Sequence, residues 1–339
     1  MKCLVVGGTG FLGGAIVDAL AEDGHEVSIL TRGKTNRSLP LGVKAIHADR
    51  FGDLSALQNT PFEWVFDTCA FEPDAVRRLL AVVGERCQRY VLISSISVYG
   101  RFTQKGLSET NAVPGATDND LAVAAGLSEG QRGSASAYGA SYGPLKRACE
   151  IAAQDCIGDR ATSLRVGLLI GAGDYMDRLT WWVRRIDQAT NDRKRIPAPA
   201  PKDRLVQMID VADVADFALR CAENELSGLW NVTGAPEPFE GVMKTIIDET
   251  GSDADLVWIS EQSILKAGIS PWTDIPLMAP PVPEFRYFLE VSTQKAVDHG
   301  LICRPLSNTL RSLITWDRTQ RDRTLIAGMS EEQEAALLS

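Results

Sequence analysis

The sequence predicts an α/β fold: a Rossmann-type, doubly wound parallel sheet joined to a smaller, mainly C-terminal domain. Three observations indicate this fold. A glycine-rich turn joins an apolar run to a helical pattern at the start of the chain, apolar runs and helical patterns keep alternating afterwards, and proline- and aromatic-rich stretches replace that alternation late in the sequence. Strands alternating with helices are typical of a parallel sheet with helices on both faces.

The bulk composition narrows the function. The 339 residues are 45% hydrophobic and 23% charged, with a net charge of −9, so the chain can bury one large core or two modest ones. The negative charge argues against a general binder of nucleic acid or anionic membrane. The seven cysteines are scattered without a C-x-x-C pair, which indicates reduced thiols rather than disulfides or a zinc site.

The first thirty residues read as strand, glycine turn, helix and strand. Residues 2–6 are an apolar run, "GGTGFLG" follows at 7–13, apolar residues then recur at helical spacing up to Gly24, and 27–30 give a second strand. Such glycines allow a tight turn, a backbone close enough to touch a pyrophosphate, and a helix N-terminus aimed at its charge. We therefore expect a dinucleotide site, and not the signal peptide that the start of the chain superficially suggests.

The alternation continues through the first half. Strands are expected at 43–47, 64–67 and 90–100, with a helix over about 74–87, and a later strand is expected within 229–239. No stretch approaches the roughly 20 apolar residues of a membrane span. We expect a cytoplasmic protein that binds neither membrane nor nucleic acid.

The end of the second strand predicts which dinucleotide binds. NAD sites usually carry an acid about twenty residues after the turn, bonded to the ribose 2′-hydroxyl. Here the strand ends in Thr31, Arg32 and Gly33. A guanidinium can bind a 2′-phosphate that an acid would repel. We therefore predict NADP as the cofactor, with NAD as the alternative. Arg32 could instead be an ordinary solvated loop residue that contacts no cofactor.

Four motifs, taken in order, resemble the extended short-chain dehydrogenase/reductases, the NAD(P)-dependent epimerase/dehydratase group to which dihydroflavonol-type reductases are related. They are "GGTGFLG", Asp49 after the third strand, "ISSISVYG" at 93–100 and "YGPLK" at 142–146. The segments "LRVGLLIGAGD" at 164–174 and "VQMIDVADVADFAL" at 206–219 extend the resemblance to about residue 235.

The resemblance implies a catalytic Ser, Tyr and Lys, which position matching assigns to Ser95, Tyr142 and Lys146, with Ser97 as the alternative serine. Tyr142 would exchange a proton with the substrate oxygen, Lys146 would hold the nicotinamide ribose and lower the tyrosine pKa, and Ser95 would hold the substrate oxygen. The expected cofactor contacts are Gly7, Gly8, Thr9, Gly10, Phe11, Leu12, Gly13, Thr31, Arg32, Asp49, Arg50, Ala70, Tyr142, Lys146 and Val166.

The spacing of the Tyr and Lys agrees with these roles. Residues four apart share one helical face, and an adjacent ammonium favours the phenolate form of a tyrosine. Pro144 is tolerated only near the start of a helix, so the helix should begin at Tyr142 with Ser141 as its N-cap. Tyr138 should then lie in a loop before the helix.

The remaining segments should select the substrate. We expect residues 1–174, with 205–235 returning to them, to form the NADP-binding domain, and 175–204 with 236–339 to form the substrate-binding region. The basic, aromatic stretch 175–204 is either an anion-binding surface or a solvated helix and loop. Of Trp181 and Trp182, one should pack inward. The expected substrate contacts are Ser97, Tyr99, Arg178, Trp181, Arg204 and Gln207.

These observations predict an NADP-dependent oxidoreductase that reduces a carbonyl, or oxidises the alcohol, of a small and possibly anionic polar metabolite. Two alternatives stay open: an NAD(P)-dependent sugar-nucleotide epimerase or dehydratase, and a non-catalytic dinucleotide-sensing or RNA-binding relative. The three histidines have no metal-ligand spacing, so no metal is expected. A homodimer is left open, as is the role of the long segment between 100 and 141.

Overall fold

The computed structural model describes residues 1–35 and 37–339, and their central feature is a parallel sheet. Its seven strands lie in the order β11 (Gly228–Val232), β6 (Ala161–Val166), β5 (Arg89–Ser95), β4 (Trp64–Asp67), β1 (Lys2–Val6), β2 (Glu26–Thr31) and β3 (Lys44–His47). Every neighbouring pair is parallel. The order reverses between β1 and β4, which confirms the doubly wound sheet predicted from the sequence.

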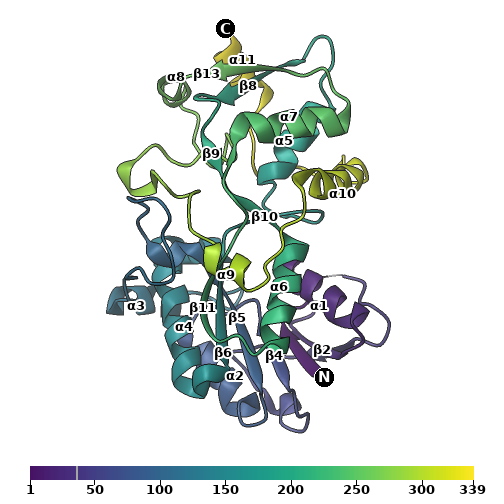
Figure 1. The fold of residues 1–339 in the computed structure, drawn as a ribbon, viewed down its shortest axis with the longest axis vertical. Coiled ribbons are helices and arrows are strands. Elements are labelled where there is room, and N and C mark those ends of the chain that lie inside the picture. The colour runs from purple at the N-terminus through teal and green to yellow at the C-terminus, as the bar shows by residue number, and fades with distance from the viewer. Residues whose placement is uncertain (36) are drawn as a thin grey trace.

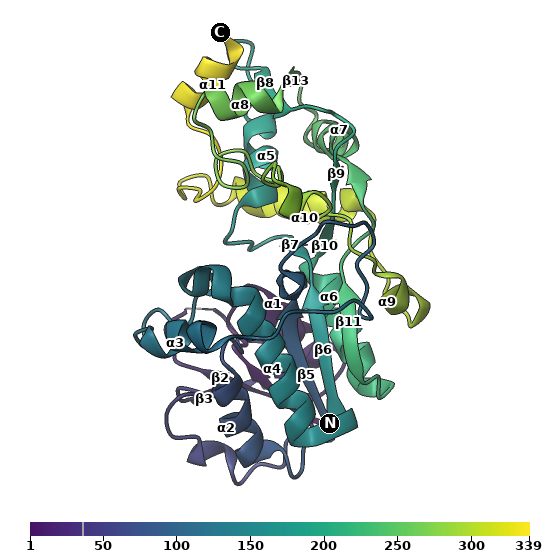
Figure 2. The same ribbon diagram turned by 90° about the vertical axis from the view of Figure 1, so that its left-hand side faces the viewer.

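Two helix pairs cover the two faces of this sheet (Figures 1 and 2). Alternate residues of a strand point to opposite faces. Cys3 and Val5 of β1 therefore pack with α1 (Phe11–Glu22) and α6 (Val211–Glu223). Leu4 and Val6 pack on the other face with α2 (Pro73–Val83) and α4 (Tyr142–Ile157).

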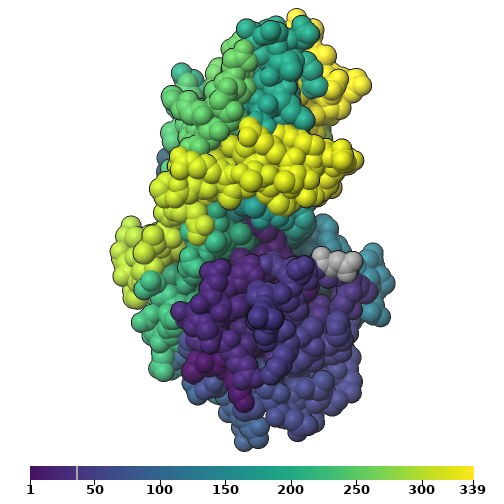
Figure 3. All heavy atoms as spheres, turned by 90° about the vertical axis from the view of Figure 1, so that its right-hand side faces the viewer, coloured from purple at the N-terminus to yellow at the C-terminus, as the bar shows by residue number. Residues whose placement is uncertain are grey.

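A second core lies in the C-terminal part of the chain, at the upper end of Figure 1. It packs α5 (Arg178–Asp187), α7 (Phe239–Thr250) and α10 (Leu306–Arg318) against the parallel pair β8 (Arg195–Pro199) and β13 (Asp255–Ile259). Figure 3 shows the late residues, in yellow, as a band above the N-terminal residues in purple.

Short elements complete the fold. They are the strand pair β7 (Leu168–Ile170) with β10 (Met208–Asp210), the pair β9 (Leu205–Val206) with β12 (Glu237–Pro238), and the helices α3 (Asp118–Gly126), α8 (Glu261–Lys266), α9 (Gln294–Asp298) and α11 (Glu331–Leu338). Among the described residues, no helix is both long and apolar enough to cross a membrane.

Several predicted elements differ at their ends. The strand expected over 90–100 stops at Ser95, because the Ser95 hydroxyl accepts a hydrogen bond from the Ser97 amide and starts a 3₁₀ turn at Ile96–Tyr99. The helix expected to reach 87 ends at Val83, before Gly84. α4 does begin at Tyr142, but Ser141 makes no capping hydrogen bond, because a 3₁₀ helix, Ala135–Ser141, runs directly into it.

Tyr138 lies in that 3₁₀ helix and not in a loop. Its ring is buried and stacks on Phe71 with the ring centroids 5.4 Å apart. Its hydroxyl donates to Glu72 Oε1 over 3.0 Å. Tyr138 is therefore a structural residue that anchors the end of the 100–141 segment to the start of α2.

Candidate active site

One cavity of about 600 Å³ lies at the carboxyl ends of the central strands, where the strand order reverses between the neighbouring strands β1 and β4. Ligands of doubly wound sheets bind at this reversal of strand order. From the first half it is lined by the glycine turn, the end of β2, Asp49 and the end of β5. Asp174, Arg178, Trp272 and Phe288 from the second half line it as well.

The glycine turn allows a close approach of backbone to backbone. Gly7 has a φ of +84°, and a Cβ on Gly13 would lie 2.2 Å from the Gly7 carbonyl oxygen. A side chain at either position would displace the turn from the N-terminus of α1. This cradle, followed by the helix N-terminus, fits the pyrophosphate of a dinucleotide.

Asp49 supplies a second sign that a nucleotide fits. Its Oδ1 accepts a hydrogen bond from the Phe51 amide over 2.9 Å, whereas its buried Oδ2 has no partner among the described residues. A buried acceptor without a donor is costly. Asp49 is therefore ready to accept a hydrogen bond from a ligand in this cavity.

Ser95, Tyr142 and Lys146 line the same cavity. Gly143 makes this possible, because a Cβ there would lie 2.1 Å from the Ser97 carbonyl oxygen. The first turn of α4 thus packs directly on the 3₁₀ turn that follows Ser95.

Electrostatics set the protonation states of the pair. Burial raises the pKa of Tyr142 to about 12, with a contact to Ser95 acting in the opposite direction. Burial lowers the pKa of Lys146, whose Nζ donates to the Ile93 carbonyl over 2.8 Å and lies 5.8 Å from the centre of the Tyr142 ring. Burial therefore dominates the pKa of Tyr142, and the lowering expected from Lys146 is not found in this structure.

Most of the predicted site residues lie around the cavity. The lining includes Gly7, Thr9, Gly10, Phe11, Leu12, Gly13, Thr31, Arg32, Asp49, Arg50 and Val166 from the expected cofactor contacts, and Ser97 and Arg178 from the expected substrate contacts. Arg50 lines it with a guanidinium already bound to both carboxylate oxygens of Asp67, each over 2.7 Å.

Two of the expected cofactor contacts, Gly8 and Ala70, do not line the cavity. Gly8 faces Ile29 and Val17 inside the first helix–strand unit. Ala70 is fully buried, while its neighbours Cys69 and Phe71 line the cavity.

Four expected substrate contacts do not line the cavity either, and their side chains have partners elsewhere. The Tyr99 hydroxyl donates to Asn231 Oδ1 over 2.8 Å. Both Trp181 and Trp182 are buried in the C-terminal core, edge to face. Arg204 donates to the Ala200 carbonyl, and Gln207 bridges Gly234 and Val291.

The basic stretch 175–204 is largely neutralised by ion pairs. Arg184 pairs with Asp317, Arg185 with Glu334, and Arg193 with Glu331. Arg178 differs: among the described residues it has no ion pair, and its guanidinium carbon lies 4.7 Å from the centre of the Trp272 ring. It is the cation of this stretch that lines the cavity.

Asp174 is a candidate site residue that the sequence reasoning missed, although it directly follows the "GAG" turn. Its side chain is 3% exposed. Oδ1 accepts from the Met176 amide over 2.8 Å, and Oδ2 is buried without a partner in the described chain. Burial raises the pKa of this carboxyl to about 6.

Replacing Asp174 with asparagine is expected to stabilise the protein at pH 7.5 more than at pH 4. Because the folded pKa is raised from the ordinary 3.8 to about 6, the unfolded chain loses this proton first, and stability falls as the pH rises from about 4 to 6. The variant escapes that loss, so its stability advantage should grow by about 2 kcal/mol between the two pH values. Urea unfolding at both pH values measures it; an advantage independent of pH would contradict it.

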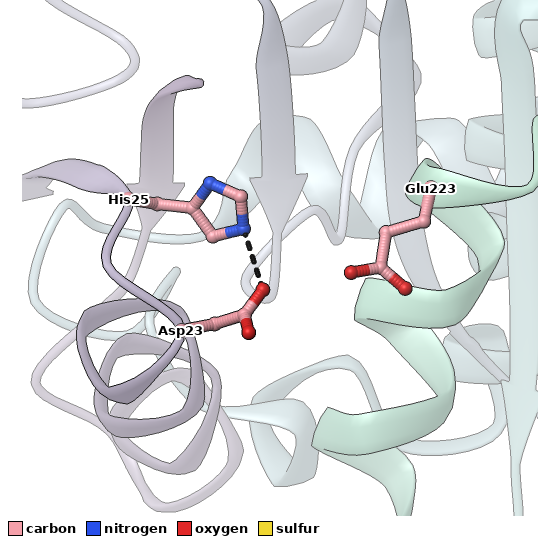
Figure 4. Close-up of side chains that lie close together, drawn as sticks. All are labelled: Asp23, His25 and Glu223. Atoms are coloured by element: carbon pink, nitrogen blue, oxygen red, sulfur yellow. Dashed lines mark hydrogen bonds and ion pairs between the residues drawn. The ribbon is translucent and has the colours of Figure 1, made fainter.

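A second cluster of titratable groups lies at the opposite ends of the strands. His25 Nε2 is 3.1 Å from Asp23 Oδ2, and Glu223 at the end of α6 faces them (Figure 4). Both acids are exposed, and His25 also contacts the N-terminal ammonium and the Trp64 ring. Solvated acids often gather in this way, and we assign no metal here.

Comparisons with known proteins find similarity in sequence and in fold. Residues 3–84 match the model of the NAD-dependent epimerase/dehydratase family. A 2′-dehydrokanamycin reductase of Streptomyces kanamyceticus is 32% identical over 119 residues, which are 34% of this chain and 33% of the relative. The match to this curated relative therefore spans about a third of its length.

Solved structures resemble the chain over nearly its whole length. A UDP-glucose 4-epimerase superposes with a TM-score of 0.69 at 15% identity, covering 96% of this chain and 99% of its own. A UDP-glucuronic acid 4-epimerase from Bacillus cereus, in complex with NAD, gives 0.64 at 15% identity, with 94% and 97% covered. Residues 3–84 thus resemble the NAD-dependent epimerase/dehydratase family, and nearly the whole chain has the fold of these epimerases.

Proposed function

We propose that this protein uses NADPH to reduce a ketone on a small, sugar-like substrate. The observation that carries the proposal is one cavity lined by the glycine turn, Arg32 and the group Ser95, Tyr142 and Lys146. The similarity of part of the chain to a 2′-dehydrokanamycin reductase supports the direction of the reaction.

The protonation state of Tyr142 also supports reduction. A ketone that accepts a hydride must also gain a proton on its oxygen, and a tyrosine with a pKa near 12 is neutral and holds that proton. When bound, NADPH supplies the hydride. Tyr142 then donates its phenolic proton, Ser95 donates a hydrogen bond to the same oxygen, and the Lys146 ammonium stabilises the phenolate left behind.

The rim of the cavity supports NADP over NAD. Arg32 and Lys34 line the cavity just after β2, and no acid takes the place after β2 that NAD sites commonly fill. Arg32 has no ion pair among the described residues; its Nη1 donates to the Glu129 carbonyl over 3.2 Å. Its remaining nitrogens are available to a 2′-phosphate.

Replacing Arg32 with alanine should lower the preference for NADPH over NADH by about 10- to 100-fold, the loss of one charge-assisted contact. The ratio of kcat/KM for the two cofactors measures it. Arg37→Ala is the matched control, because Arg37 lies in the same loop but is ion-paired with Asp18 of α1. A preference unchanged by Arg32→Ala would contradict the 2′-phosphate contact.

The reaction itself can be tested with a panel of keto-sugars, free and nucleotide-linked, followed by the absorbance of the reduced nicotinamide. We expect one NADPH oxidised for each ketone reduced. Interconversion of sugar nucleotides without net NADPH consumption would instead favour the epimerase alternative. Tight NADPH binding with no turnover on the whole panel would favour a non-catalytic dinucleotide sensor.

A further inference from the structure

The long segment between Gly100 and Tyr142 reaches the cofactor end of the cavity. α3 is held at its start by a capping box between Thr117 and Asp120. The residues after it meet the end of β2, where the Glu129 carbonyl accepts from Arg32 and the Glu129 carboxylate lies 3.9 Å from Lys34 Nζ. Arg132, Gly133 and Ala135 then line the cavity itself.

Gly133 marks how closely this segment approaches Arg32. A Cβ at Gly133 would lie 2.3 Å from Arg32 Nη2. The backbone of residue 133 is therefore in contact with the guanidinium that we assign to the 2′-phosphate. Arg132, one residue earlier, brings a second guanidinium to the same end of the cavity.

The position of Arg132 is fixed from both sides. Its carbonyl accepts a hydrogen bond from the Tyr138 hydroxyl over 3.1 Å. Its guanidinium carbon lies 4.8 Å from the centre of the Phe51 ring, and its Nε is 3.5 Å from Glu72 Oε1. In the described part of the chain neither terminal nitrogen donates a hydrogen bond, and the side chain is 26% exposed. The fork therefore faces the cavity rim without a strong partner.

We propose that Arg132 is a second guanidinium that binds the 2′-phosphate of NADP, so that the 100–141 segment closes over the adenosine end of the cofactor. The inference rests on the proposed use of NADP. Arg32 and Arg132 would clasp one phosphate from two elements a hundred residues apart, and each fork can donate two parallel hydrogen bonds to it. Lys34 lies at the same rim, where the Glu129 carboxylate, 3.9 Å from its Nζ, offsets its charge.

Two small ligands separate this role from simple stacking on adenine. The probes are 2′,5′-ADP and 5′-AMP, which differ in the 2′-phosphate and need no turnover. In calorimetric titrations of the full chain, Arg132→Ala should weaken 2′,5′-ADP binding about tenfold and leave 5′-AMP nearly unchanged. Arg132→Lys keeps the charge without the planar guanidinium, so its affinity for 2′,5′-ADP should lie between those of the unaltered protein and Arg132→Ala. Arg101→Ala is the control, because Arg101 lies in the same segment but pairs with Glu284 outside the cavity.

The outcomes are distinguishable. Equal weakening of both probes would mean that Arg132 only packs on the adenosine, which overturns the proposal. Arg132→Ala without effect, alongside a strong effect of Arg32→Ala on 2′,5′-ADP, would overturn it while leaving the use of NADP intact. Equal binding of the two probes by the unaltered protein would overturn the use of NADP as well. If Arg132→Ala does not fold, Arg132→Lys gives the same comparison.

Discussion

Replacing Tyr142 with phenylalanine is expected to lower kcat for ketone reduction about a thousandfold, within the range typical of a lost general acid. The variant keeps the ring that lies 6.2 Å from Phe71 but has no proton to donate. Binding of NADPH should change little, because the glycine turn and Arg32 are untouched. Single-turnover measurements of NADPH oxidation, together with a cofactor titration, separate the two effects.

Tyr138→Phe is the matched control. Tyr138 lies four residues earlier, on the other side of a kink at Gly139, and its hydroxyl bonds to Glu72 and to the Arg132 carbonyl. Its loss should cost about 1 kcal/mol of unfolding free energy, as for a single hydrogen bond, and leave the proton transfer intact. Equal kcat losses in the two variants would refute the assignment of Tyr142 as the proton donor.

The same pKa fixes the pH dependence of the two directions. Because burial raises the pKa of Tyr142 to about 12, the neutral phenol needed for reduction persists throughout the neutral and mildly alkaline range. Oxidation of the alcohol needs the phenolate, so its rate should rise with pH in that range. A rate of reduction that stays flat with pH beside a rate of oxidation that rises, with the rise lost in Tyr142→Phe, would support the assignment.

The parts of the fold that follow from local pattern are predictable from the sequence. The glycine turn, the alternation of strands and helices, and the start of α4 depend on residues close together in the chain. Gly13 packs against the backbone of Gly7, six residues earlier in the chain. Pro144 is tolerated only in the first turn of α4, so it fixes where that helix starts. The residues of the first half that line the cavity could therefore be predicted from the order of these strands, turns and helices.

The part of the cavity formed by the second half of the chain depends on long-range contacts, which cannot be predicted from local sequence patterns. Trp272 and Phe288 reach the cavity from the C-terminal core, and Arg184 is neutralised by Asp317, 133 residues later. Arg204 and Gln207 have the polarity of ligand-binding residues, yet their hydrogen bonds close loops within the protein. Polar residues of this kind are distinguished only by the partners that the tertiary structure brings to them.

Replacing Glu150 with alanine should lower the free energy of unfolding by about 3–5 kcal/mol, the cost of leaving a buried charge without its partner. Glu150 and Arg165 are at most 1% exposed and form two hydrogen bonds of 2.9 Å. Glu150 also accepts from the Ser94 hydroxyl over 2.7 Å and from Arg147. Chemical denaturation of the purified variant measures the loss.

Two further variants test the cause. Asp248→Ala removes one member of the exposed pair Lys244–Asp248 on α7 and should change stability little. Glu150→Leu combined with Arg165→Met removes both charges and should recover part of the loss, because no unpaired ion remains. If the double variant is as unstable as Glu150→Ala, then shape rather than charge dominates at this site.

The Glu150–Arg165 pair also lies close to the candidate active site. Glu150 is one helical turn beyond Lys146, and both side chains bind β5. A double variant that regains stability but not kcat would show that the pair also positions Lys146.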